Sequence, residues 1–108
     1  MKKQKYKAFR ATSAAKLTGF LDRLFRHRPY DHYVVKIYSK NLPNEELWPL
    51  LERYHNKIEW YTREKSLVFV PDDYDDPDEM PAWLSLAPSE LEASDVIDFE
   101  QIERDLNF

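Results

Sequence analysis

The sequence predicts a small single α+β domain, roughly α-β-α-β-β, with a mixed or antiparallel sheet and an acidic helical C-terminal segment. Three observations predict this fold. Apolar residues recur at helical spacing over 17–25, and β-branched and aromatic residues fill 32–39. Residues 57–62 and 66–70 have the pattern of two strands joined by a short turn. A length of 108 residues with 43% hydrophobic residues suits one domain spanning 1–108.

The first helix has a start signal, an apolar face and a stop signal. Thr12 or Ser13 can cap its N-terminus, and Pro29 ends it. Gly19 costs about 1 kcal/mol relative to Ala inside a helix, so we expect it to permit close packing. Before this helix, residues 5–10 fit a short edge strand.

The middle of the chain alternates strand and helix signals. In strand 32–39, Tyr33, Val35 and Ile37 share one face. Leucines then recur at helical spacing from Leu47, but Pro49 lacks an amide hydrogen, so we expect that helix to begin near Pro49. The apolar run 67–70 is typical of a central strand.

The C-terminal third begins with a loop and ends in helices. Residues 71–81 combine three prolines with six acids, which predicts a solvated loop. Ser89 begins a capping box, which predicts a short helix, and Asp98 begins a second one.

Composition excludes several kinds of site. The chain has no cysteine and one glycine, which excludes disulfides, thiolate metal sites and glycine-rich phosphate loops. The acids at 72–79 lack the glycine and distant glutamate of a calcium-binding EF-hand loop. The three histidines do not have zinc-ligand spacing, and no serine lies in a nucleophile elbow. We therefore expect a protein that is not an enzyme and that uses no cofactor or metal.

The sequence carries no targeting signal that we recognise. The basic N-terminal residues are not followed by an apolar stretch of the signal-peptide kind, and no apolar run approaches about 20 residues. We expect a cytoplasmic protein.

Charge is strongly partitioned along the chain. Residues 1–40 form a basic part with a net charge of +9, and residues 72–108 form an acidic tail with a net charge of −12. Either the basic helix packs beside the acidic tail, or one charged region faces a partner.

The first functional hypothesis is a protein-binding inhibitor or modulator. Closely spaced carboxylates among apolar residues can imitate nucleic acid and occupy the Lys/Arg groove of another protein. This composition resembles that of small counter-defence proteins of phages and mobile elements, including anti-CRISPR and anti-restriction proteins. The same physics fits an immunity protein or antitoxin. The expected partner-binding residues are acidic apart from one tryptophan: Asp72, Asp73, Asp75, Asp76, Asp78, Glu79, Trp83, Glu90 and Glu92.

The second hypothesis is an RNA- or DNA-binding domain that uses the basic helix and strand aromatics. Residues 37–42 (IYSKNL) resemble the first motif of RNA-recognition domains, and residues 65–70 (KSLVFV) lie where the second motif belongs. Ser66 replaces the glycine of that motif, and Leu67 replaces an aromatic residue. The resemblance implies base stacking on two aromatic residues, and the basic helix adds three phosphate contacts. The expected residues are Arg23, Arg26, Arg28, Tyr38 and Phe69.

Overall fold

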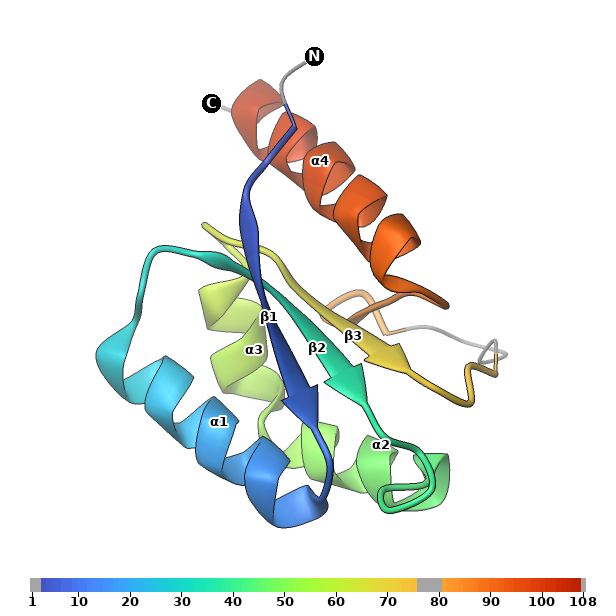
Figure 1. The fold of residues 1–108 in the computed structure, drawn as a ribbon. Coiled ribbons are helices and arrows are strands. Elements are labelled where there is room, and N and C mark those ends of the chain that lie inside the picture. Colours follow the sequence, from blue (N-terminus) through green and yellow to red (C-terminus); the bar gives the residue numbers. More distant parts are fainter. Residues whose placement is uncertain (1–2, 76–80, 108) are drawn as a thin grey trace.

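In the computed structural model, which describes residues 3–75 and 81–107, each of the first two strands is followed by helices that return the chain to the same end of the sheet. Figure 1 shows the arrangement. The elements are β1 (Tyr6–Ala11), α1 (Ala14–His27), β2 (His32–Ile37), α2 (Asn44–Arg53), α3 (His55–Tyr61), β3 (Leu67–Pro71), β4 (Ser85–Leu86) and α4 (Glu90–Leu106).

The sheet is parallel throughout its described strands, in the order β1-β2-β3-β4. The predicted mixed or antiparallel sheet is therefore wrong. Helix α1 connects β1 to β2, and helices α2 and α3 connect β2 to β3, so the strands are joined by crossovers and not by hairpins. An antiparallel RNA-recognition sheet is excluded for the same reason. The edge strand expected near 5–10 is confirmed as β1, and β3 is internal as expected.

The predicted hairpin failed because residues 55–61 form helix α3 and not a strand. Tyr54, Ile58 and Tyr61 are spaced at i, i+4 and i+7, which continues the helical periodicity of α2. Ile58 and Tyr61 are buried, whereas Lys57, Glu59 and Trp60 are exposed. Strand alternation and helical periodicity both fit such a short stretch, and packing of the helical face decided between them.

Helices cover both faces of the sheet. One core cluster joins α1, α2 and α3 to one side of the strands through Val35, Ile37 and Phe69. A smaller cluster joins α4 to the other side through Val34 and Val68. Figure 1 shows α4 on the opposite side of the sheet from the other helices. The basic helix α1 therefore does not pack beside the acidic helix α4.

Three helix boundaries bear on the sequence-based expectations. Ser13 caps α1, and its side chain accepts a hydrogen bond from the Lys16 amide (3.2 Å). Helix α2 begins at Asn44 and not near Pro49, which lies inside it. The two short helices expected at the C-terminal end are one helix, α4, capped by Ser89. Within the described residues, we find no helix both long enough and apolar enough to cross a bilayer.

Candidate binding surfaces

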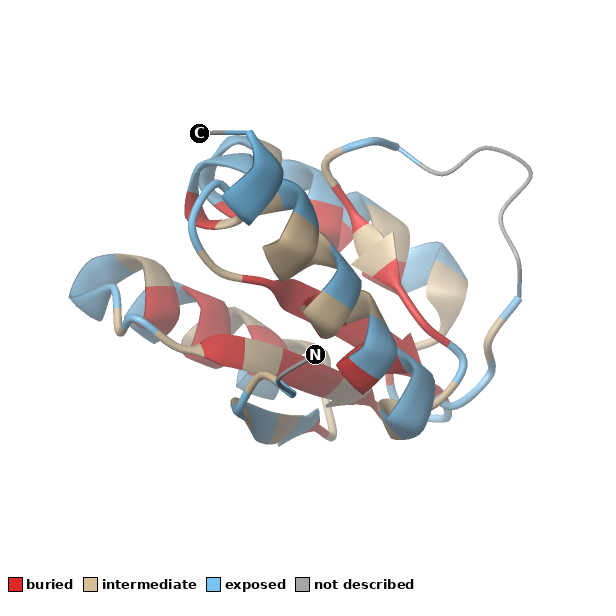
Figure 2. Cartoon of the chain, turned by 90° about the horizontal axis from the view of Figure 1, so that it is seen from above, coloured by how far each residue is buried: buried red, intermediate tan, exposed pale blue. Residues whose placement is uncertain are grey.

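The large hydrophobic side chains that remain exposed in the described part of the chain gather in two places. Tyr30 lies in the loop after α1 and Trp60 on α3, whereas Leu91, Phe99 and Leu106 lie on α4. Figure 2 shows buried residues concentrated in the strands and a helix running to the C-terminus that is largely exposed or half-buried. Exposed aromatic and apolar side chains in a group are typical of binding surfaces. The two groups lie on opposite faces of the sheet and differ in charge.

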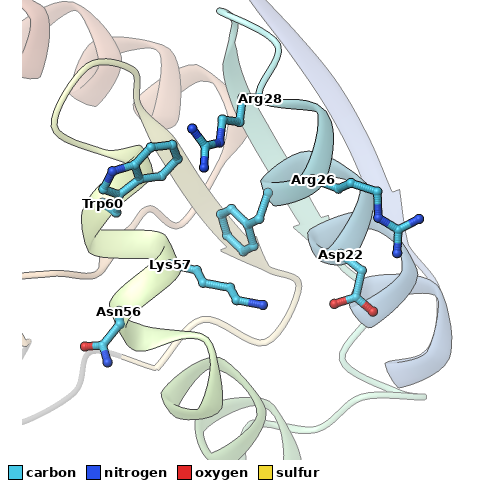
Figure 3. Close-up of a pocket in the computed structure, with 7 residues that line it drawn as sticks. Asp22, Arg26, Arg28, Asn56, Lys57 and Trp60 are labelled. Carbon is cyan, nitrogen blue, oxygen red and sulfur yellow. The ribbon is translucent and has the colours of Figure 1, made fainter.

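The first surface is a hollow of about 500 Å³ between the end of α1 and the outer side of α3. Figure 3 shows the side chains that line it. Arg26 and Arg28 come from the end of α1, and Lys57 and Trp60 come from α3. Asp22 adds a carboxylate, which accepts a hydrogen bond from the Tyr54 hydroxyl (2.8 Å).

A second hollow of about 210 Å³ adjoins the first and shares Arg28 and Trp60 with it. Arg63 and Lys65 follow α3 and add two more cations, and Glu64 adds one carboxylate. We call the two hollows together the basic groove, defined by Arg26, Arg28, Tyr30, Lys57, Trp60, Arg63 and Lys65.

Arg28 occupies an unusual backbone conformation at the centre of the groove. Its φ of 50° and ψ of 54° are left-handed, and it is the one described non-glycine residue with positive φ. Its amide donates to the Leu24 carbonyl (2.9 Å), which ends α1. Its guanidinium carbon lies 4.2 Å from the centroid of the Trp60 ring. Glycine is the usual residue at such a helix end, so an arginine here costs backbone energy that a role in the groove would explain.

Hydrogen bonds from the buried side of α3 fix the loop that carries Arg28 and Tyr30. The buried Tyr61 hydroxyl donates to the carbonyl oxygens of Pro29 (2.8 Å) and Asp31 (2.7 Å). Burial raises the pKa of Tyr61 well above its usual value, so the hydroxyl keeps its proton. Tyr61 thus links the loop after α1 directly to α3.

The second surface lies on α4, which carries seven acids and one base. Some of these acids dock the helix onto the sheet. Glu90 pairs with Lys36 and accepts from the Tyr6 hydroxyl (2.6 Å), and these contacts, Lys36 first, lower the pKa of Glu90. Asp98 accepts from the Gln4 amide (2.8 Å), which lowers the pKa of Asp98. These carboxylates have structural partners within the chain.

The other side of α4 points away from the sheet. Leu91 is 73% exposed, Phe99 is 64% exposed and Leu106 is 77% exposed. At about 100° per residue these positions lie within about 80° of one another on the helix circumference. Glu92, Asp95 and Glu103 lie between or beside them, and all three are exposed. We call this surface the acidic helix face: Leu91, Glu92, Asp95, Phe99, Glu103 and Leu106.

The predicted partner-binding residues are distributed over three places. Asp72, Asp73 and Asp75 are exposed after the carboxyl end of β3, and we call them the acidic edge. Glu90 and Glu92 follow β4 and therefore begin α4 at the same end of the parallel sheet. Trp83 precedes β4 and stacks on His55 with ring centroids 4.3 Å apart, away from that edge. Asp76, Asp78 and Glu79 lie outside the described residues.

The residues predicted to bind nucleic acid are also divided. Arg26 and Arg28 line the basic groove, whereas the exposed Arg23 does not. Tyr38 is half-buried beside the Arg10 guanidinium (5.6 Å) at the end of β2. Phe69 is completely buried in the core, so its ring has no surface on which a base could stack.

Sequence reasoning missed Lys57 and Trp60, because residues 57–62 were expected to be a strand. In a strand, Lys57 and Trp60 would point to opposite faces; in a helix, a spacing of three places them on one side. The alternative helical periodicity was present in the sequence as Tyr54, Ile58 and Tyr61.

Comparisons with protein-family models, curated proteins and solved structures found no match. Among the described residues, no three potential metal ligands are grouped closely enough to bind an ion. The function is therefore inferred from the geometry of the two surfaces.

Proposed function

We propose that this protein binds another protein, with its acidic helix face and acidic edge occupying a basic surface of the partner. The observation that carries the proposal is the apolar side of α4, where Leu91, Phe99 and Leu106 are exposed among carboxylates. An amphipathic helix of this kind lays its apolar anchors into a groove, and the surrounding carboxylates match a groove rimmed by Lys and Arg.

The acidic edge supports the same proposal. Backbone contacts fix its position, because the Asp72 amide donates to the Ile37 carbonyl (2.9 Å) and the Asp73 amide donates to the Ser39 hydroxyl (3.0 Å). The three carboxylates have no ion pair with any described residue. They therefore remain available to a partner's cations.

A basic surface of this kind is the one that proteins present to nucleic acid, so a partner held in this way is blocked from nucleic acid. A nucleic-acid enzyme and a basic toxin offer the same chemistry. The partner recovered from the source cells decides between the two: a nucleic-acid enzyme would make this protein an inhibitor, and a toxin would make it an immunity protein.

The test begins with affinity capture from an extract of the source cells, followed by calorimetry with the purified partner. We expect Phe99→Ser to weaken binding about 30-fold, which corresponds to the roughly 2 kcal/mol of a hot-spot residue. We expect the triple variant Asp72→Asn, Asp73→Asn, Asp75→Asn to weaken binding and to reduce its salt dependence.

The matched control removes three exposed carboxylates away from both acidic surfaces, Glu52→Gln on α2, Glu59→Gln on α3 and Glu64→Gln in the turn after α3. It should bind like the wild type at matched salt. Equal affinity of the wild type, the edge variant and Phe99→Ser would contradict the proposal.

A further inference from the structure

The basic groove lies on the face of the sheet opposite the acidic helix face, so protein binding by α4 does not use it. From its geometry we infer that it is a binding site for single-stranded nucleic acid. The cations would contact phosphates, and Trp60 and Tyr30 would stack with bases.

The charge of the groove points to an anionic ligand. Arg26, Arg28, Lys57, Arg63 and Lys65 make no ion pair with any described carboxylate. Among the described lysines and arginines, ion pairs are confined to Lys3, Lys7 and Lys36, none of which lines the groove. Five unpaired cations around two connected hollows concentrate positive potential where a phosphate backbone could lie.

The aromatic residues point to bases and not to phosphate alone. Tyr30 is 76% exposed and Trp60 is 41% exposed, although aromatic side chains contribute most to stability when they are buried. Cations lie on both sides of Trp60: Arg26 and Lys57 in the first hollow, Arg63 and Lys65 in the second. A positively charged groove interrupted by aromatic rings is the arrangement that binds unpaired strands.

The shape favours a single strand over a duplex. Both rings are exposed where they line the hollows, and a base that is paired and stacked inside a duplex cannot stack on them. Figure 3 shows Trp60 at the side of the first hollow. The first hollow, about 500 Å³, falls within the range of small-molecule sites. The Asp22 carboxylate beside it can accept hydrogen bonds from the amino groups of a base.

The left-handed Arg28 provides a test that separates function from folding. Glycine adopts this conformation without strain, so Arg28→Gly should fold at least as stably as the wild type. The same substitution removes the guanidinium that both hollows share. A loss of binding in this variant therefore cannot be attributed to unfolding.

The experiment is fluorescence anisotropy with labelled 12-nucleotide oligo-dT and oligo-U and with a duplex of equal length, at low and high salt. We expect both single strands to bind more tightly than the duplex, with the RNA and DNA arms showing which is preferred. Trp60→Ala should weaken binding about 5- to 160-fold, the range found for loss of one stacked base. With at most five phosphate contacts, the slope of log K against log salt should not exceed about −3.5.

The matched control is Lys16→Gln, which removes an exposed cation of α1 outside the groove. It should bind like the wild type. Undetectable binding at low salt, preference for the duplex, or equal affinity of Arg28→Gly and Trp60→Ala with the wild type would overturn the inference. So would self-association that these two variants abolish, because that would identify the groove as an interface between copies of the chain.

Discussion

At the scale of single residues, the most constrained side chain outside the two surfaces is His32. It is 3% exposed, and its Nδ1 accepts a hydrogen bond from the Ser66 amide (2.9 Å). The proton must therefore be on Nε2, which has no hydrogen-bond partner among the described residues. Burial, first, and then the charges of Lys65 and Arg104 together lower the pKa of His32 to about 4. A protonated ring would also carry a hydrogen on Nδ1, and this N–H would point at the N–H of Ser66. The hydrogen bond therefore also favours the neutral ring.

This residue predicts how stability depends on pH. An unfolded His titrates near 6.5, so between pH 6.5 and 4 the unfolded chain binds the extra proton and the folded chain does not. Stability should be complete above pH 6.5 and should fall by about 2 kcal/mol between pH 7.5 and 5.0, measured by urea unfolding. His32→Gln keeps an acceptor for the Ser66 amide and should lose most of this dependence. An undiminished fall in that variant would assign the effect to other groups.

At the scale of elements, the surroundings of Gly19 in α1 bear on the expectation that this glycine permits close packing. The sequence suggested that Gly19 permits close packing, but a methyl group there would meet only the flexible end of Arg23, at 3.6 Å. The position is helical with ordinary backbone angles, so the glycine only adds entropy to the unfolded chain.

We therefore expect Gly19→Ala to stabilise the protein by about 1 kcal/mol in urea unfolding. Ala15→Gly is the opposite change at an exposed position of the same helix, and it should destabilise by a similar amount. A loss of stability in Gly19→Ala would mean that the glycine is required for packing after all.

The elements with strong local signals were predictable, and those decided by packing were not. Helix α1, with Ser13 before it and Pro29 after it, and strand β2, with its two distinct faces, have such signals. Helix α3 has only seven residues, and β4 has two and no sequence signature of its own. Because residues 57–62 were expected to form a strand, the sequence predicted a hairpin where the structure has a helical crossover. The predicted relative direction of the strands was therefore wrong. An acidic surface could be hypothesised from composition alone. The basic groove could not, because Lys57 and Trp60 lie on one side only when residues 55–61 form a helix.

At the scale of the whole molecule, charge is divided between the two faces of the sheet. Helix α4, with its acids, covers one face, and the basic end of α1 and Lys57 of α3 lie over the other. The sheet separates them, which explains how a chain with a net charge of only −4 can present two surfaces of opposite sign. Lys3 and Lys36 neutralise part of α4, so the partition along the sequence is only partly preserved in space.

The sheet has two edges that differ in how they are protected from pairing with another chain. At one edge, β4 is only two residues long. At the other, β1 is six residues long and carries Lys7 and Arg10, both exposed. A strand edge with unpaired backbone groups can add a strand from a neighbour, and charged side chains hinder this.

We expect the double variant Lys7→Val, Arg10→Val to associate more strongly than the wild type, because valine favours the extended strand and the repulsion between edges is lost. Sedimentation velocity over a range of concentrations measures the change. The control Lys16→Val, Arg23→Val removes the same charges from the exposed side of α1 and adds the same apolar area, but it offers no strand edge. Association of both variants to the same extent would attribute the effect to lost charge, whereas association of the edge variant alone would show that β1 itself is the site at which a second chain pairs.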